Sequence, residues 1–156
     1  MKIRILSVGT KMSSWVDEGY ADYAKRLNPI LKIDLIELPL AKRGKNTDVS
    51  QAVASEADAI KKHLRAREKV IVLDVLGKPI STQLLSEKLS DWQMEGSDIA
   101  LIIGGPDGLD ASINERSDEQ WSLSHMTLPH PIVRLLVIEQ LYRGLMINRN
   151  HPYHRE

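Results

Sequence analysis

Residues 99–108 read IALIIGGPDG, an unbroken apolar run that ends in a glycine-rich segment. A run such as Ile99 to Ile103 is typical of a strand whose two faces are both covered. A second run, Val70 to Val75, is nearly all apolar and rich in β-branched residues, so it predicts another strand of this kind. Such strands occur in parallel sheets that carry helices on each side. The two runs therefore predict an α/β fold with a mainly parallel sheet and helices on both faces.

The segments around these runs alternate between strand and helix patterns. Three more strands are predicted at Ile3 to Val8, Ile33 to Leu38 and Trp121 to Leu123. Helices are predicted from Ser13 or Ser14 to Asn28, from the capping box of Asp48 and Gln51 to Leu64, from Thr82 to Gly96, from Ala111 to Arg116, and from Pro131 through Leu145. The segment Gly77-Lys78-Pro79 is predicted to turn the chain. Since no linker or repeat divides the pattern, we expect one domain over residues 1–156.

Composition excludes several classes of function. The chain has 156 residues, enough to bury about two thirds of the surface that it exposes when unfolded. It lacks cysteine, which excludes disulfides, thiolate metal sites and a cysteine nucleophile, and which suits a reducing compartment such as the cytoplasm. The 21 basic and 21 acidic residues cancel, so any RNA binding would depend on local basic clusters. The apolar run at the N-terminus is too short for a signal peptide or a membrane span.

Ligands of open parallel sheets bind beyond the carboxyl ends of the strands, which selects the residues after Val75 and Ile103. The glycine-rich segment 104–108 could let backbone amides approach a ligand, but taken alone it is more typical of an ordinary tight turn. The later loop, Leu123 to His130, mixes apolar and hydrogen-bonding side chains and is stiffened by Pro129. It could wall an uncharged, apolar group such as adenine, or it could lead into the next helix with His130 as a cap.

Other kinds of site find little support. His151 and His154 have an H-x-x-H spacing, but a zinc site needs three or four rigidly held ligands, and Pro152 prevents the helical form of the motif. We therefore expect no metal site. A P-loop is excluded because neither Gly-Lys pair is followed by serine or threonine. The turn at Gly9 lacks the further glycines of a dinucleotide-binding fingerprint.

Two basic clusters are candidates for RNA contacts. One is the loop 42–45 with Lys42, Arg43 and Lys45. The other consists of arginines in or after the last helix, which are Arg134, Arg143, Arg149 and Arg155. Basic side chains in such groups can bind phosphate. Scattered surface arginines are nevertheless common, and Glu139 and Arg143 stand four residues apart, so this pair could form only an ion pair on the helix surface.

Several short motifs form a recognisable set when they are taken in order. They are GTKM (9–12), KRGK (42–45), IGGPDG (103–108), LSHMTLPHP (123–131) and the terminal NHPYHRE (150–156). In their order, spacing and distance from the C-terminus they resemble the ribosomal large-subunit pseudouridine N3-methyltransferases, a family of the SPOUT class. The resemblance runs from the first strand to the last residue. One departure is Asp107, where this family is expected to carry glutamate.

The resemblance implies an rRNA methyltransferase that uses S-adenosylmethionine and has an α/β-knot fold with a trefoil knot in the C-terminal half. The implied substrate is N3 of a pseudouridine in helix 69 of 23S rRNA, on the assembled ribosome. A homodimer is also implied, and the helix from Ile132 to Ile147 has a broad apolar face that could pack in one. The implied cofactor residues are Leu73, Gly104, Gly105, Leu123, Ser124, His125, Met126, Thr127 and Leu128.

Methylation at N3 removes a proton from the ring, and the end of the chain offers groups for this step. His154 is the candidate base because imidazole titrates near neutral pH, and Glu139 is the second choice. Tyr153 could stack on the target base. Arg143 and Arg155 could hold phosphate or the oxygen on which negative charge develops.

Two other functions fit the sequence. A ribosome-binding factor without catalytic activity would use the same basic residues but would need no cofactor pocket. A small-molecule nucleotide enzyme would act without RNA. Cofactor binding and RNA dependence distinguish both from a methyltransferase.

Overall fold

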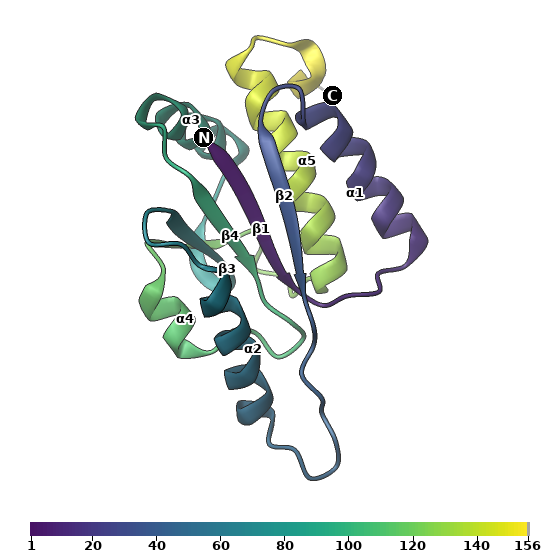
Figure 1. Ribbon diagram of the computed structural model, residues 1–156. Coiled ribbons are helices and arrows are strands. Elements are labelled where there is room, and N and C mark those ends of the chain that lie inside the picture. The colour runs from purple at the N-terminus through teal and green to yellow at the C-terminus, as the bar shows by residue number, and fades with distance from the viewer. Residues whose placement is uncertain (156) are drawn as a thin grey trace.

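A five-stranded parallel sheet organises the computed structural model, which describes residues 1–155 (Figure 1). The strands are β1 (Lys2–Val8), β2 (Lys32–Leu38), β3 (Lys69–Pro79), β4 (Ile99–Ile103) and β5 (Glu119–Ser122). Their order is β2-β1-β4-β3-β5, and every neighbouring pair is parallel. The predicted α/β class with a parallel sheet is confirmed. The quoted run Ile99–Ile103 forms the central strand, and all of its residues are buried.

Helices cover both faces of this sheet, as predicted (Figure 1). They are α1 (Ser14–Leu27), α2 (Val49–His63), α3 (Thr82–Glu95), α4 (Ala111–Arg116), α5 (His130–Asn148) and a short 3₁₀ helix, η1 (Pro152–Arg155). Helices α1, α3 and α5 pack on one face, and α2 and α4 on the other. None of the helices within residues 1–155 is sufficiently long and apolar to cross a lipid bilayer.

The two apolar cores follow from the alternation of side chains along the inner strands. In β1, Ile3 and Ile5 face α1, α3 and α5, whereas Leu6 and Val8 face α2 and α4. β4 alternates in the same way. Because a strand turns successive side chains to opposite faces, a strand between two helix layers must be apolar throughout. This requirement is why the runs at 70–75 and 99–103 could be recognised in the sequence.

Polar residues cap the starts of α2 and α3, but only Asp48 and the terminal Gly96 are the predicted ones. Ser81 replaces Thr82 at the start of α3, and Ser13 makes no side-chain capping bond. The Asp48 carboxylate accepts a hydrogen bond from the Ser50 amide at 3.1 Å at the start of α2. Ser81 caps α3 through the amide of Leu84, and Gly96 ends that helix in the left-handed conformation, with a φ of 69°. Each contact satisfies a backbone group that the helix leaves without an intrahelical partner.

The predicted turn at Gly77-Lys78-Pro79 is wrong, because β3 continues through it. After a bulge between Leu73 and Lys78, the strand pairs again with β5, where Lys78 lies opposite Trp121. A Cβ atom on Gly77 would lie 2.7 Å from the backbone nitrogen of Trp121. The glycine is therefore needed for the close approach of two backbones, a role that produces the same sequence signal as a turn.

Two boundaries also differ from the prediction. β5 ends at Ser122, so Leu123 already belongs to the following loop. α5 begins at His130 with Pro129 in the capping position, which makes Pro131 the second helical residue. A proline at either place costs no hydrogen bond, since the first amides of a helix have no intrahelical acceptor.

Candidate functional site

A cleft of about 760 Å³ opens where β4 ends and where β3 bulges after Leu73. Its floor is formed by these parts of the two strands, and its walls by the loops that follow β4 and β5 and by the start of α5. The lining residues are Leu73, Asp74, Val75, Ile103, Gly104, Gly105, Pro106, Gly108, Leu109, Leu123, Ser124, Met126, Thr127, Leu128, Pro129, His130, Pro131 and Val133. The cleft thus lies at the carboxyl edge that the rule for parallel sheets selects.

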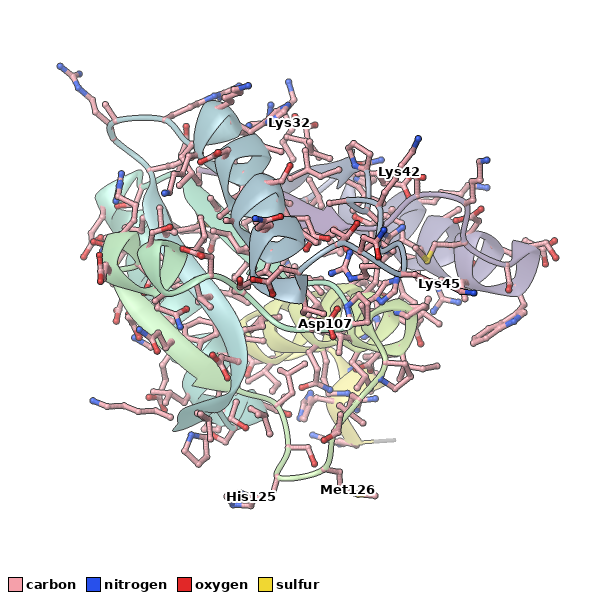
Figure 2. All side chains as sticks on the ribbon, turned by 90° about the horizontal axis from the view of Figure 1, so that it is seen from below. Lys32, Lys42, Lys45, Asp107, His125 and Met126 are labelled. Atoms are coloured by element: carbon pink, nitrogen blue, oxygen red, sulfur yellow. The ribbon has the colours of Figure 1, made fainter. Side chains whose placement is uncertain are left out.

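All but one of the residues predicted to bind a cofactor line this cleft. The exception is His125, which is exposed and lies with Met126 at the tip of the loop after β5 (Figure 2). The sequence prediction missed Asp74, Leu109 and Val133, whereas His130 belongs to the loop that was expected to form a wall. Asp74 directly follows the predicted residue Leu73, and this adjacency was the available signal. Leu109 and Val133 carry only the general signal of an apolar residue.

The glycine-rich segment after β4 is folded back on itself. A Cβ atom on Gly104 would lie 2.9 Å from the Leu109 side chain and 3.1 Å from the Gly108 backbone. Gly108 has a φ of 78°, in the left-handed region that favours glycine. Gly104 is therefore required for the turn itself, so the segment forms the tight turn that the sequence allowed.

The loop between β5 and α5 is held by its own serines. The Ser122 hydroxyl donates to the carbonyl of Ser124 at 2.9 Å, and the Ser124 hydroxyl accepts from the amide of Met126 at 3.0 Å. This turn directs Met126, which is 74% exposed, to the rim of the cleft. Leu123 and Leu128 remain within the lining. The loop therefore supplies apolar side chains and backbone groups on a fixed frame.

His130 lies at the inner end of this loop and carries a neutral ring at neutral pH. Burial, and next the charge of Arg134, lowers the pKa of His130 below its ordinary value. The predicted capping role is not observed, since Pro129 occupies the capping position and α5 starts at His130.

Arg134 does not belong to an RNA-binding cluster. It is fully buried on α5, where its guanidinium donates to Glu37 at 2.8 Å, to the Ser7 hydroxyl at 3.1 Å and to the Gly9 carbonyl at 3.2 Å. Its inclusion in the basic set is therefore wrong. A buried cation must be paired, and Arg134 uses its charge to join α5 to the ends of β1 and β2.

The basic loop after β2 carries three cations, of which Arg43 is paired and Lys42 and Lys45 are exposed. Arg43 donates to Glu56 at 2.7 Å and to Asp107 at 2.6 Å, and so joins this loop to α2 and to the turn after β4. Lys42 and Lys45 are exposed on the same loop, which passes beside Asp107 (Figure 2). Asp107 stands where the family is expected to carry glutamate. Its shorter carboxylate still reaches Arg43.

The end of the chain is docked on α1 and α5. Tyr153 packs its ring edge-on against Tyr142 at 4.7 Å, and its hydroxyl donates to Glu139 at 3.1 Å. Glu139 and Arg143 form the predicted ion pair at 2.7 Å, and the Arg143 guanidinium lies 4.8 Å from the centre of the Tyr153 ring. The structure thus brings Glu139, Arg143 and Tyr153 together. Glu156 lies outside the described residues.

The tail and the cleft lie at opposite ends of α5. The cleft includes His130, the first residue of this helix, whereas the tail follows Asn148, its last. At 1.5 Å per residue the helix separates them by roughly 27 Å. Figure 1 shows the tail at the edge of the sheet where the strands begin. The residues predicted for catalysis therefore do not meet the cleft of their own chain.

Comparison with known proteins gives the family. Residues 1–154 match the family described as "Predicted SPOUT methyltransferase". The chain belongs to the SPOUT methyltransferase family. Among described residues 1–155, no three histidine, aspartate or glutamate side chains are grouped so that they could hold a metal ion.

Curated relatives match nearly the whole length of this chain. It is 55% identical to a protein of Saccharophagus degradans, over 99% of this chain and 100% of the relative. It is 46% identical to a protein of a Marinomonas species, with the same coverage, and 49% identical to one of Acinetobacter baumannii, over 99% of each. All three relatives are named ribosomal RNA large subunit methyltransferase H.

Removing the cation between the two loops should destabilise the protein. In Arg43→Ala the Glu56 carboxylate, 3% exposed, would lose its charged partner, and we expect a loss of about 2–3 kcal/mol in the free energy of unfolding. Urea unfolding measures this quantity. Lys42→Ala, the neighbouring exposed cation, is the control and should change it by less than about 0.5 kcal/mol. Equal stability of the two variants would contradict the structural role of Arg43.

Proposed function

We propose that this protein methylates N3 of a pseudouridine in helix 69 of 23S rRNA, using S-adenosylmethionine, on assembled ribosomes in the cytoplasm. Family membership supports methyl transfer, and the names of three full-length relatives support an rRNA substrate. The observation that carries the proposal is the cleft at the strand exits, together with a tail whose polar groups lie outside that cleft.

The cleft fits the cofactor in size and in charge. Its volume of about 760 Å³ lies within the range of about 300–1,000 Å³ that small-molecule sites occupy. Leu73, Leu123 and Leu128 offer apolar walls for the adenine, and backbone groups of Gly104 and Gly105 offer hydrogen-bonding partners. Asp74 is the one carboxylate in the described lining, and His130 is neutral, so the cleft suits a cofactor that carries a positive sulfonium.

When bound, the cofactor supplies an electrophilic methyl group on sulfur. The chain's own residues hold the donor and direct the acceptor, because in-line transfer depends mainly on alignment. A base among the chain's own residues would accept the proton that N3 loses on methylation. We assign cofactor binding to Leu73, Gly104, Gly105 and the segment 123–128.

His154 is the best base among the candidates. Its Nδ1 atom lies 2.5 Å from the carbonyl oxygen of His151, and a carbonyl can only accept, so Nδ1 carries the hydrogen. The neutral ring then has its free electron pair on Nε2, ready to take a proton. Glu139 is less suitable, since it already accepts hydrogen bonds from Tyr153, Gln140 and Arg143. The exposed Arg155 is proposed to hold phosphate or the developing oxyanion.

In a homodimer the tail of one chain would lie at the cleft of the other. Within one chain the two are roughly 27 Å apart, so the tail is proposed to serve the cleft of a partner. Exposed apolar residues on the outer side of the helices favour such packing, since Leu136 of α5 is 38% exposed and Trp15 of α1 is 56% exposed. The trefoil knot in the C-terminal half stays part of the proposal. The chain crosses β3 on its way from β4 to β5 and then returns to α5 on the opposite face.

Methylation of purified ribosomes tests the activity and the role of the tail. Mass spectrometry of the 23S rRNA should show one added methyl group at the helix 69 pseudouridine with the parent protein. Deletion of residues 153–156 should abolish the product, while calorimetric affinity for S-adenosylmethionine stays within about twofold because the cleft is untouched.

Two results would contradict this account. Methylation at the parent rate without residues 153–156 would remove the tail from the mechanism. Failure of the parent protein to bind the cofactor, even with ribosomes present, would favour the ribosome-binding factor.

Lys42 and Lys45 are proposed to contact rRNA phosphate. Replacing both with glutamine should reduce the steepness of the salt dependence of ribosome binding, by about 1–2 in log–log slope, because each phosphate contact releases a counterion. Filter binding over a range of salt concentrations measures the slope. The control replaces Lys61 and Lys62, which are exposed at the end of α2. Equal slopes for both double variants and the parent would show that the loop does not contact RNA.

A further inference from the structure

A hydroxyl on α1 holds the end of the chain. The Tyr23 hydroxyl lies 3.1 Å from the Tyr153 hydroxyl, across 130 positions of sequence. The Tyr153 hydroxyl donates its own hydrogen to the Glu139 carboxylate, which can only accept. The hydrogen between the two tyrosines must therefore come from Tyr23. The result is a directed chain from Tyr23 to Tyr153 to Glu139, with Glu139 paired to Arg143.

Aromatic and cationic groups hold the rings of this chain in place. Tyr142 contacts both tyrosine rings, with centroid distances of 6.1 Å to Tyr23 and 4.7 Å to Tyr153. Arg26 lies 5.3 Å from the centre of the Tyr23 ring, and Arg143 lies 4.8 Å from that of Tyr153. Burial, reinforced by the contacts with Tyr23 and Glu139, raises the pKa of Tyr153, so its phenol stays protonated at neutral pH. The network therefore clamps a protonated Tyr153 by its ring and by its hydroxyl.

Both ends of the Tyr153 side chain are thus used inside its own chain. Its ring is enclosed by Tyr142 and Arg143, and its hydroxyl is shared between Tyr23 and Glu139. This leaves little of the side chain for stacking on a target base, the role first considered for it. His154 and Arg155, the next two residues, are not enclosed in this way, and Arg155 is exposed.

We propose that Tyr23 is a positioning residue for the catalytic tail: its hydrogen bond fixes Tyr153, and Tyr153 in turn fixes the place of His154 and Arg155. This inference rests on the proposed function, in which the tail acts on the rRNA. Tyr23 lies on α1, far from the cleft, so it acts on turnover through the tail and not on cofactor binding. Without the bond the tail still exists but samples more positions, which lowers the fraction of complexes in reactive alignment.

The matched pair Tyr23→Phe and Tyr20→Phe tests this role. Both residues lie on α1, and both changes remove one hydroxyl, but the Tyr20 hydroxyl is buried without a hydrogen-bond partner among the described residues. With ribosomes as substrate, Tyr23→Phe should lower kcat by about three- to tenfold, the effect expected of one hydrogen bond. Cofactor affinity by calorimetry should stay at the parent value. Tyr20→Phe should keep the parent kcat.

A double-mutant cycle separates positioning from general destabilisation. Tyr153→Phe removes the other end of the same bond, so adding Tyr23→Phe to it should cause little further loss of kcat. Rates are expressed per cofactor-binding site, so that a smaller folded fraction cannot imitate the effect. Trypsin should also cleave after Arg149 faster in Tyr23→Phe than in Tyr20→Phe, because the tail is released more often.

Three results would overturn the inference. One is a kcat for Tyr23→Phe equal to that for Tyr20→Phe, and another is losses that multiply fully in the double variant. The third applies if the Tyr23→Phe protein does not fold. Tyr153→Phe alone should then lower kcat, and a Tyr153→Phe protein with the parent kcat would contradict the clamp. If deletion of residues 153–156 abolishes methylation while Tyr23→Phe behaves as its control, the proposed function stands and only the positioning role fails.

Discussion

A parallel sheet sends every strand in the same direction, so each connection must carry the chain back to the edge where strands begin. In this protein that constraint places the ends of β4 and β5 at one edge beside the bulge of β3, and there the loops after β4 and β5 form the cleft with residues 73–75. From this cleft α5 runs to the opposite edge, and the tail follows from its end (Figure 1). The length of α5 thus fixes how far the tail lies from the cleft of the same chain.

Polar contacts of long sequence separation keep the two ends of the molecule in shape. At the cleft edge, Arg134 joins α5 to β1 and β2, and Arg43 joins the basic loop to the turn after β4. At the other edge, Tyr23 and Glu139 hold the tail. Arg134, Arg43 and Glu139 thus form contacts within the protein that stabilise its fold. We therefore propose that RNA contacts are made by exposed residues such as Lys42, Lys45 and Arg155.

The sequence was sufficient for the strand pattern and for most of the cleft. Apolar runs at 70–75 and 99–103 require two helix layers, and the exit rule together with the family resemblance selected Gly104 and the 123–128 loop. His125 could not be separated from its neighbours, because the turn at Ser124 decides which side chains point outward. The turn predicted at Gly77 was wrong because a glycine in a β-bulge and a glycine in a turn leave the same signal in the sequence.

Other features depend on contacts that no local pattern reports. In the sequence Arg134 resembles any other helical arginine, and only the structure shows that it is paired with Ser7 and Glu37. Tyr23 and Tyr153 stand 130 positions apart, and neither motif indicates the other. Such pairs form only once the sheet order has brought α1 and α5 together. The family resemblance named the tail as functional, but the structure was needed to show how the tail is held.

Mixed dimers test most directly whether a tail serves the cleft of another chain. One variant lacks residues 153–156 but keeps its cleft, and the other carries Gly104→Val, which distorts the cleft loop against Leu109 but leaves the tail intact. Each variant alone should be inactive on ribosomes. Random mixing makes half of the dimers mixed, with one complete site of two, so about one quarter of the parent activity should return. A mixture that stays inactive, although mixed dimers are demonstrated by mass spectrometry, would contradict a site shared between chains.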